Sequence, residues 1–342
     1  MKQELYSLQF LRFIAITLVI FAHLPTVQYN SSFSFLVGGA IGVDLFFIIS
    51  GFIMMYVTIP NTNSLSFFLR RFLRIAPLNI FFTLLIIIIS YSLYLNPEYG
   101  NAGTLYHFPY SKVDFIYFLE SIFFVHLDKT PINSIAWSLQ MEFIFYSLFA
   151  ICLFLGINRL LFFTIYGGLI IIYNYFNGFG IDNRFIKYLF NPLMIEFVMG
   201  VFLYKLYKME LIKPSDKVLI IFLLMIVFVF FGKFDSYSQG SFYRPLTYGM
   251  ISFFIIYLFL VYEEKIKFSK IFLLFGDASY SLYLTHWTLL CFSSFFISSI
   301  EQISYYSVYI SLCIMASFFI GVLVYKYIEL PMHNLIRKKI KY

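Results

Sequence analysis

The chain has 342 residues, of which 61% are hydrophobic and only 12% are charged, and its formal net charge is +7. A soluble domain carries about 25% charged residues, so the composition excludes a soluble globular protein. It predicts one membrane domain, residues 1–342, embedded in the lipid bilayer. The positive charge has a topological explanation, given below, so no nucleic-acid partner is expected. The three cysteines have no metal-ligand spacing, and no metal site is expected.

Stretches of about 20 apolar residues recur along the chain, as helices that cross a bilayer require. Their number predicts an all-α polytopic membrane protein with about ten transmembrane helices. A shorter apolar piece, Val113 to Val125, contains Asp114 and Glu120 and is interpreted as a re-entrant or interfacial segment. The expected spans are residues 8–24, 36–58, 78–95, 136–156, 160–177, 187–206, 218–232, 245–262, 277–298 and 305–328.

Lysines and arginines are distributed unevenly between the loops that join these spans. Ten spans put both termini on one side of the membrane, and the positive-inside rule assigns that side to the cytoplasm. In this orientation 17 of the 24 lysines and arginines lie inside and 6, among them Arg244, lie outside. We therefore expect a multi-pass protein of the cell membrane with both termini in the cytoplasm.

The first apolar segment, Leu8 to Leu24, carries Arg12 and His23. A charged side chain at the centre of a bilayer costs about 3 kcal/mol and usually serves a function. Eleven positions at about 100° each bring the two side chains to nearly the same helix face, roughly 16 Å apart. They are expected to line one path, with Arg12 guiding a substrate and His23 acting as a general base. For His23, an interfacial histidine at a helix end is the alternative interpretation.

Two carboxylates are expected near this path. Asp44 lies several residues inside the second span, where a carboxylate needs a cationic or hydrogen-bonding partner, and Arg12 is the predicted one. Glu142 lies just inside the fourth span, at a depth similar to that of His23. Its carboxylate can orient the imidazole as in triad-like sites. A purely structural ion pair is the alternative for Asp44.

A cluster of three arginines, Arg70, Arg71 and Arg74, precedes Pro77 and the third span. Arg71 and Arg74 are three residues apart, so one helical turn presents both on one side. Guanidinium groups bind phosphate bidentately, so the cluster predicts a phosphate-binding site. A positive-inside stop signal is the alternative interpretation.

These residues together resemble the acyltransferase-3 family of integral membrane acyltransferases. The matching motifs stand in the family's order and cover most of the chain. They are Leu11-Arg12 to His23 with its ten-residue gap, Gly42 to Phe52, Arg71-x-x-Arg74-Ile75-x-Pro77, Trp137-Ser138-Leu139 with Glu142, and Ser279 to His286. After the glutamate the family often has a polar residue, whereas Phe143 to Tyr146 is apolar here.

The resemblance implies transfer of an acyl group, usually acetyl, from cytoplasmic acyl-CoA to a hydroxyl of a surface polysaccharide or lipid-linked glycan. It ties activity to Arg12, His23, Arg71 and Arg74. Some members carry an extra hydrolase-like domain. This chain is expected in the shorter subgroup, which includes enzymes that modify exopolysaccharide or O-antigen.

In the expected mechanism Arg71 and Arg74, with Arg70, hold the phosphates of acyl-CoA, while His23 takes the proton of the sugar hydroxyl. An acyl-enzyme on His23 is a second possibility. A proton-coupled transporter or flippase of a glycan or lipid intermediate is the competing class, because buried ionisable residues also mark carriers. Acyl-CoA dependence separates the two classes. The sequence assigns no role to two deeper residues, Glu196 and His286.

Overall fold

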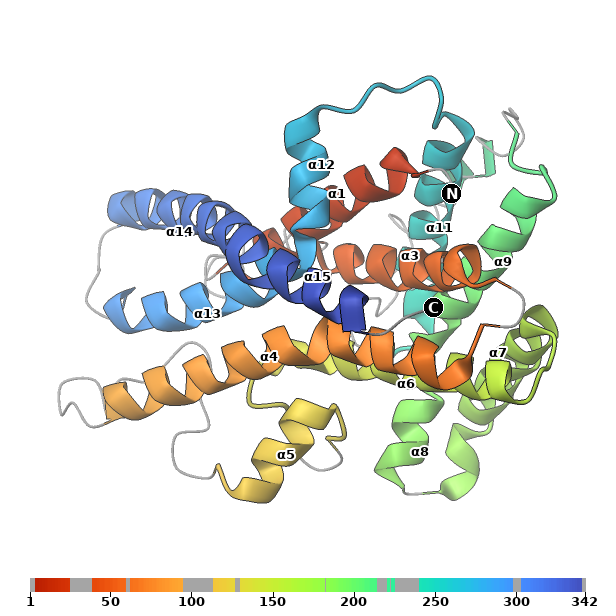
Figure 1. Cartoon of the computed structure of the whole chain (residues 1–342), viewed down its shortest axis with the longest axis horizontal. Coiled ribbons are helices and arrows are strands. Elements are labelled where there is room, and N and C mark those ends of the chain that lie inside the picture. Colours follow the sequence, from red (N-terminus) through yellow and green to blue (C-terminus); the bar gives the residue numbers. More distant parts are fainter. Residues whose placement is uncertain are drawn as a thin grey trace. The chain divides into compact units, whose positions relative to one another are not determined.

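All regular structure in the computed structural model is helical over the residues that it describes, in agreement with the all-α prediction (Figure 1). These residues are 4–24, 39–59, 62–94, 113–126, 130–181, 183–213, 220–221, 223–224, 240–297 and 303–339. The α-helices are α1 (Tyr6–Ala22), α3 (Ile41–Val57), α4 (Ser64–Tyr94), α5 (Phe115–Phe123), α6 (Trp137–Phe154), α7 (Arg159–Tyr175), α8 (Arg184–Leu189), α9 (Met194–Lys208), α11 (Met250–Val261), α12 (Lys270–Asp277), α13 (Ser279–Ile297), α14 (Ile303–Val324) and α15 (Leu330–Lys339). Shorter helical turns are η2 (Ser134–Ala136), η3 (Asn177–Gly180), η4 (Pro245–Gly249) and η5 (Tyr325–Glu329).

The chain forms two compact units whose segments alternate along the sequence. The first unit comprises Met1–Val19, Gly38–Phe67 and Ile144–Asp277. The second unit comprises Ile20–Val37, Phe68–Phe143 and Ala278–Tyr342. Each unit therefore has its own packed interior, and each is described separately below.

The core of the first unit is the close packing of α3 against α9. Small residues let helix backbones approach one another, which is common where helices associate in membranes. A Cβ added to Gly51 of α3 would lie 2.1 Å from the carbonyl oxygen of Phe197. A Cβ added to Gly200 of α9 would lie 2.1 Å from the carbonyl oxygen of Ile48. The two glycines are thus required by the short distance between the two backbones.

Replacing Gly200 by alanine is expected to lower the melting temperature of the detergent-solubilised protein clearly. The added methyl group meets the backbone of Ile48, which cannot rotate away, and overpacking of this kind costs about 1–3 kcal/mol or more. Gly168→Ala in α7 is the matched control, because a Cβ there meets no atom within 4 Å. Equal melting temperatures for the two variants would contradict the close contact of α3 and α9.

The second unit is built around α13, which packs against α14 (Figure 1). The hydroxyl of Tyr280 at the start of α13 donates to the carbonyl oxygen of Ile75 in α4 (2.5 Å). Farther along both helices, Ile86 of α4 and Leu290 of α13 belong to one buried apolar cluster. The order of these two contacts shows that α4 and α13 run in the same direction.

Several helices have the length and apolar character that crossing a bilayer requires. Among the described residues, four helical segments meet both conditions, namely Ser64–Tyr91, Ser134–Phe154, Arg184–Lys208 and Ser311–Ile336. Shorter apolar helices occupy Tyr6–Ala22, Ile41–Val57, Arg159–Tyr175 and Pro245–Val261. The expected count of about ten spans is not confirmed, and the span expected at 218–232 falls largely outside the described residues.

Two helix boundaries differ from the prediction. The expected span at 78–95 is the second part of α4, which begins at Ser64 and contains Pro77 (Figure 1). Proline removes one backbone hydrogen bond, but the helix continues on both sides of it. The span expected at 187–206 corresponds to the candidate span Arg184–Lys208, which is divided into α8 and α9 with Pro192 between them.

The short apolar piece at Val113 to Val125 forms the nine-residue helix α5. Asp114 caps it, because its side chain accepts a hydrogen bond from the backbone N–H of Tyr117 at 2.7 Å. Phe124 ends the helix in the left-handed conformation, with a φ of 59°. Nine residues are too few to cross a bilayer, and the re-entrant or interfacial position of this segment stays a prediction.

Candidate active site

Two histidines from distant parts of the sequence meet in the second unit. His23 follows the last turn of α1, and His286 lies on α13. Nε2 of His286 is 3.4 Å from Nδ1 of His23, and the ring centroids are 5.4 Å apart. Trp287 places its ring edge-on to His23 at 5.3 Å. His286 is completely buried, whereas His23 is partly exposed, so only the His23 ring is open to a reacting molecule.

The hydrogen bonds of this imidazole pair assign the tautomers of both rings. Nδ1 of His286 lies 3.0 Å from the carbonyl oxygen of Leu282, which can only accept, so Nδ1 carries the proton. Nε2 of a neutral His286 is then an acceptor, and the Nδ1–H of His23 donates to it. Nε2 of His23 is left with a lone pair, as a general base requires.

Tyr283 fixes α13 beside the beginning of α6. Its hydroxyl donates to the carbonyl oxygen of Ile135 (2.6 Å) and lies 2.8 Å from the hydroxyl of Ser138. The Tyr283 ring lies beside His286, with 5.7 Å between the ring centroids. Because Tyr283 is anchored to η2 and α6, the position of the His286 ring is held by more than its own helix.

An apolar cluster surrounds the end of the unit that carries the imidazole pair. Leu24 follows His23 directly, and Leu290 lies one turn beyond His286. Both belong to a cluster with Ile86 of α4, in which Tyr117 and Ile132 also take part. The imidazoles are thus set in a mostly apolar surrounding, where polar interactions are stronger than in water.

The predicted arginine cluster lies at the end of the α4–α13 contact that is farther from the imidazole pair. Arg70, Arg71 and Arg74 are half-buried side chains of α4. Arg74 interacts electrostatically with Tyr280, six residues before His286, which is about 9 Å along a helix. The second unit therefore holds cationic groups and the imidazole pair roughly 10 Å apart along its helices.

Glu142 lies between these two ends. Its carboxylate acts electrostatically on Tyr280 and Tyr283, the two tyrosines of α13 that separate the arginines from His286. The partner that the structure shows for Nδ1 of His23 is His286. That Glu142 orients the His23 ring stays a prediction. In the structure, the residue that contacts Nδ1 of His23 and can orient its ring is His286.

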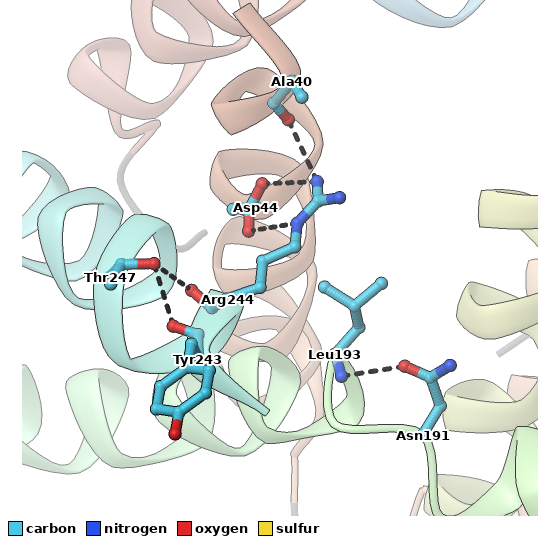
Figure 2. A network of polar contacts seen from close by, with 7 residues as sticks. All are labelled: Ala40, Asp44, Asn191, Leu193, Tyr243, Arg244 and Thr247. Atoms are coloured by element: carbon cyan, nitrogen blue, oxygen red, sulfur yellow. Dashed lines mark hydrogen bonds and ion pairs between the residues drawn. The ribbon is translucent and has the colours of Figure 1, made fainter. Parts of the chain in front are cut away.

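A buried ion pair joins α3 to the residue that precedes η4 in the first unit (Figure 2). Nε and Nη2 of Arg244 donate to Oδ1 and Oδ2 of Asp44 at 3.0 and 2.8 Å, and Nη2 also donates to the carbonyl oxygen of Ala40. Arg244 is 2% exposed and Asp44 is fully buried. Glu196 of α9 is fully buried and interacts electrostatically with both charges.

This ion pair corrects one prediction. Arg244, and not Arg12, is the ion-pair partner of Asp44. Arg244 is buried within its unit, and its expected place on the outer side of the membrane stays a prediction. A bidentate pair that satisfies both carboxylate oxygens fits the structural alternative for Asp44. Arg12 and His23 fall in separate compact units, so their common path stays a prediction.

Comparison with known protein families identifies the chain. A family model described as an acyltransferase domain matches residues 5–325. The chain belongs to the acyltransferase-3 family. This match confirms the resemblance that the ordered motifs indicated.

Relatives in the acyltransferase-3 family carry names that describe O-acetylation. O-acetyltransferase OatA of Staphylococcus aureus is 26% identical over 366 residues, which cover 93% of this chain and 56% of that protein. Peptidoglycan O-acetyltransferase OatA of Listeria monocytogenes is 30% identical over 136 residues, which cover 36% of this chain and 21% of the Listeria protein. The chain thus spans about half the length of the Staphylococcus relative. No solved structure matches it.

Several buried polar residues of this acyltransferase-3 chain were not singled out by its sequence. Asn79, Thr83, His126, Asn133 and Gln140 all lie in the second unit and are nearly or fully buried. Each has at least one side-chain polar atom without a hydrogen-bond partner among the described residues. Burial lowers the pKa of His126 to about 4, so its ring is neutral at pH 7. In the sequence, the only signal for such a buried polar residue was its position within or beside an apolar run.

Proposed function

We propose that the protein is a membrane O-acyltransferase that moves an acetyl group from cytoplasmic acetyl-CoA to a hydroxyl of a cell-surface polysaccharide. The observation that carries the proposal is the hydrogen-bond chain from Leu282 through His286 to His23. It leaves Nε2 of His23 as a base in a chain of the acyltransferase-3 family. The names of the relatives make peptidoglycan the first acceptor to test, before exopolysaccharide.

In the proposed reaction, Nε2 of His23 takes the proton of the acceptor hydroxyl while that oxygen attacks the thioester carbonyl. The tetrahedral intermediate then collapses, the carbon–sulfur bond breaks, and the leaving CoA thiolate receives the proton from His23. The acceptor gains an acetyl ester, and CoA leaves as the thiol. A positioned base of this kind contributes on the order of 10²–10⁴ in rate.

His286 is the proposed positioning residue of this reaction. Its Nε2 accepts the Nδ1–H of His23, which keeps the lone pair of His23 on the opposite side of the ring. His286 thereby takes the part that the sequence offered to Glu142. The parts of Arg12 and Asp44 in the reaction stay predictions, because both residues belong to the first unit.

Arg71 and Arg74, with Arg70, are the proposed contacts of the acetyl-CoA phosphates.

Replacing Arg71 by alanine is expected to raise the KM for acetyl-CoA about 10- to 100-fold, with a smaller change in kcat. One charge-assisted contact is worth about 1.5–3 kcal/mol. Initial rates at varied acetyl-CoA concentration measure the effect. Lys208→Ala removes an exposed positive charge from the first unit and is the matched control, with an unchanged KM. An unchanged KM for Arg71→Ala would remove this arginine from the phosphate site.

The proposed orientation follows from the distribution of positive charge. With both termini in the cytoplasm, the arginine cluster faces the side on which acetyl-CoA is made, and His23 faces outward. The protein is then a multi-pass protein of the cell membrane. Labelling of single cysteines introduced at the two termini, in intact and permeabilised cells, tests this orientation.

The decisive test combines cells and purified protein. Base-labile acetyl esters are measured in peptidoglycan and in other surface polysaccharides from cells that lack the protein and from cells in which it is restored. Proteoliposomes that contain the protein are then given radiolabelled acetyl-CoA and glycan acceptor. Restored esters and labelled glycan support the proposal. Glycan export without consumption of acetyl-CoA would support the transporter instead.

A further inference from the structure

Asn79 and Thr83 are two fully buried polar residues in the middle of α4. Over the described part of the chain, the amide nitrogen and oxygen of Asn79 and the hydroxyl of Thr83 have no hydrogen-bond partner. Buried polar groups of folded proteins nearly always have partners, so each exception needs an explanation.

Other buried hydroxyl groups of the same helices do have hydrogen-bond partners, so the lack of a partner is particular to Thr83. Ser90, also buried on α4, donates to the carbonyl oxygen of Ile86 four residues earlier, at 2.7 Å. Thr288 of α13 makes the same kind of bond to Leu284. A threonine in a helix commonly forms this local bond, and Thr83 does not form it. Its hydroxyl is therefore available to a molecule other than its own helix.

The position of the two residues is defined by the contacts on either side of them. Ile75 bonds to Tyr280, and Ile86 packs in one cluster with Leu290. Asn79 and Thr83 lie about 6 and 12 Å beyond Ile75, and His286 lies about 9 Å beyond Tyr280 along its own helix. Both residues are thus on the level of the imidazole pair, beyond the arginines of the same helix.

Other elements of the second unit carry similar groups. The amide of Asn133 and the side-chain oxygens of Gln140 and Thr285 also lack partners within the described ranges. Asn133 stands two residues before Ile135, which accepts the hydroxyl of Tyr283 next to His286. The unpartnered groups are neutral, and they include both donors and acceptors. They suit a neutral ligand that has donors and acceptors of its own, rather than an ion.

We propose that Asn79 and Thr83 bind the amide groups of the pantetheine arm of acetyl-CoA. This inference rests on the proposed function, in which phosphates lie at Arg71 and Arg74 and the thioester lies at His23. The arm that connects them is a neutral chain with two amides, and it has to pass the level of α4 at which the two residues lie. A side-chain amide complements a ligand amide, because each offers one acceptor and N–H donors.

The test compares two acetyl donors. Acetyl-CoA has the amide-bearing arm, whereas the acetyl thioester of ethanethiol has none. Asn79→Leu and Thr83→Val are expected to lower kcat/KM for acetyl-CoA about 10-fold each and to leave kcat/KM for the short thioester unchanged. Ser90→Ala is the matched control, because it removes a buried hydroxyl of the same helix that bonds locally. Thr83→Ser keeps the hydroxyl and is expected to retain the preference for acetyl-CoA.

The outcomes separate this inference from the proposed function. Equal losses with both donors, or no loss with either, would overturn the amide contacts. Binding of CoA alone, measured by calorimetry on the intact protein, is the second readout. If the wild type transfers no acetyl group but binds CoA more tightly than Asn79→Leu, the reaction is wrong and the binding site stands. If Asn79→Leu, folded by its melting curve, binds CoA as tightly as the wild type, the binding site is wrong.

Discussion

Replacing His23 by alanine is expected to reduce acetyl transfer by at least about 100-fold while the protein still inserts and folds. The imidazole is the only group in the proposed reaction that takes the hydroxyl proton, and loss of a general base costs about 10²–10⁴ in rate. The His23 side chain is partly exposed, so its removal leaves a smaller cavity than the loss of a fully buried ring. Initial rates with acetyl-CoA, together with the melting curve and the amount of protein in the membrane, measure the effect.

His286 provides the comparison that separates chemistry from folding. His286→Ala removes the acceptor that holds Nδ1–H of His23 and is expected to slow transfer about 10- to 100-fold. His286→Gln keeps a carbonyl oxygen in the side chain and is expected to recover part of the loss. Full activity of His23→Ala would disprove the base assignment. Equal activity of His286→Ala and wild type would disprove the orienting contact.

Local sequence patterns predicted the all-helical class and the bounds of some helices. Runs of apolar residues gave nearly the observed bounds of α3 and α6, because a helix that buries most of its surface needs a continuous apolar stretch. The start of α4 was predicted too late, near Pro77, since proline normally marks a helix start or end. Only the packing of the surrounding residues shows that the helix continues through it.

Pairs of distant residues were beyond the reach of the sequence. His23 and His286 are separated by 263 positions and Asp44 and Arg244 by 200. A single sequence reports which residues share a helix face, but not which helices meet. The prediction therefore paired Asp44 with Arg12, the nearest intramembrane cation in the sequence, and passed over Arg244 at the edge of an apolar run.

The unpartnered polar groups were hidden for a different reason. Asn79 and Thr83 stand in an apolar run as isolated polar residues, and such residues are commonly satisfied by neighbouring helices. Whether a polar atom lacks a partner depends on every atom around it. The family could thus be predicted from the sequence motifs, whereas the candidate donor-binding groups needed the packed structure.

The buried ion pair of the first unit predicts an unequal cost for its two partners. Arg244→Ala leaves Asp44 and Glu196 buried without their cation and is expected to cost about 3–5 kcal/mol of stability. Asp44→Ala leaves Glu196 to interact with Arg244 and is expected to cost less. Melting temperatures in detergent rank the variants.

Arg184→Ala is the control for this ranking, because it removes an arginine from the exposed first turn of α8 and should leave the melting temperature unchanged. The double variant Asp44→Leu with Arg244→Met tests the physical reason. Replacing both members of a buried pair by apolar residues is commonly close to neutral, so this variant is expected to be more stable than Arg244→Ala. If Asp44→Ala were the less stable single variant, Glu196 would not share the charge of Arg244. The ion pair would then act as an isolated link between α3 and the residues before η4.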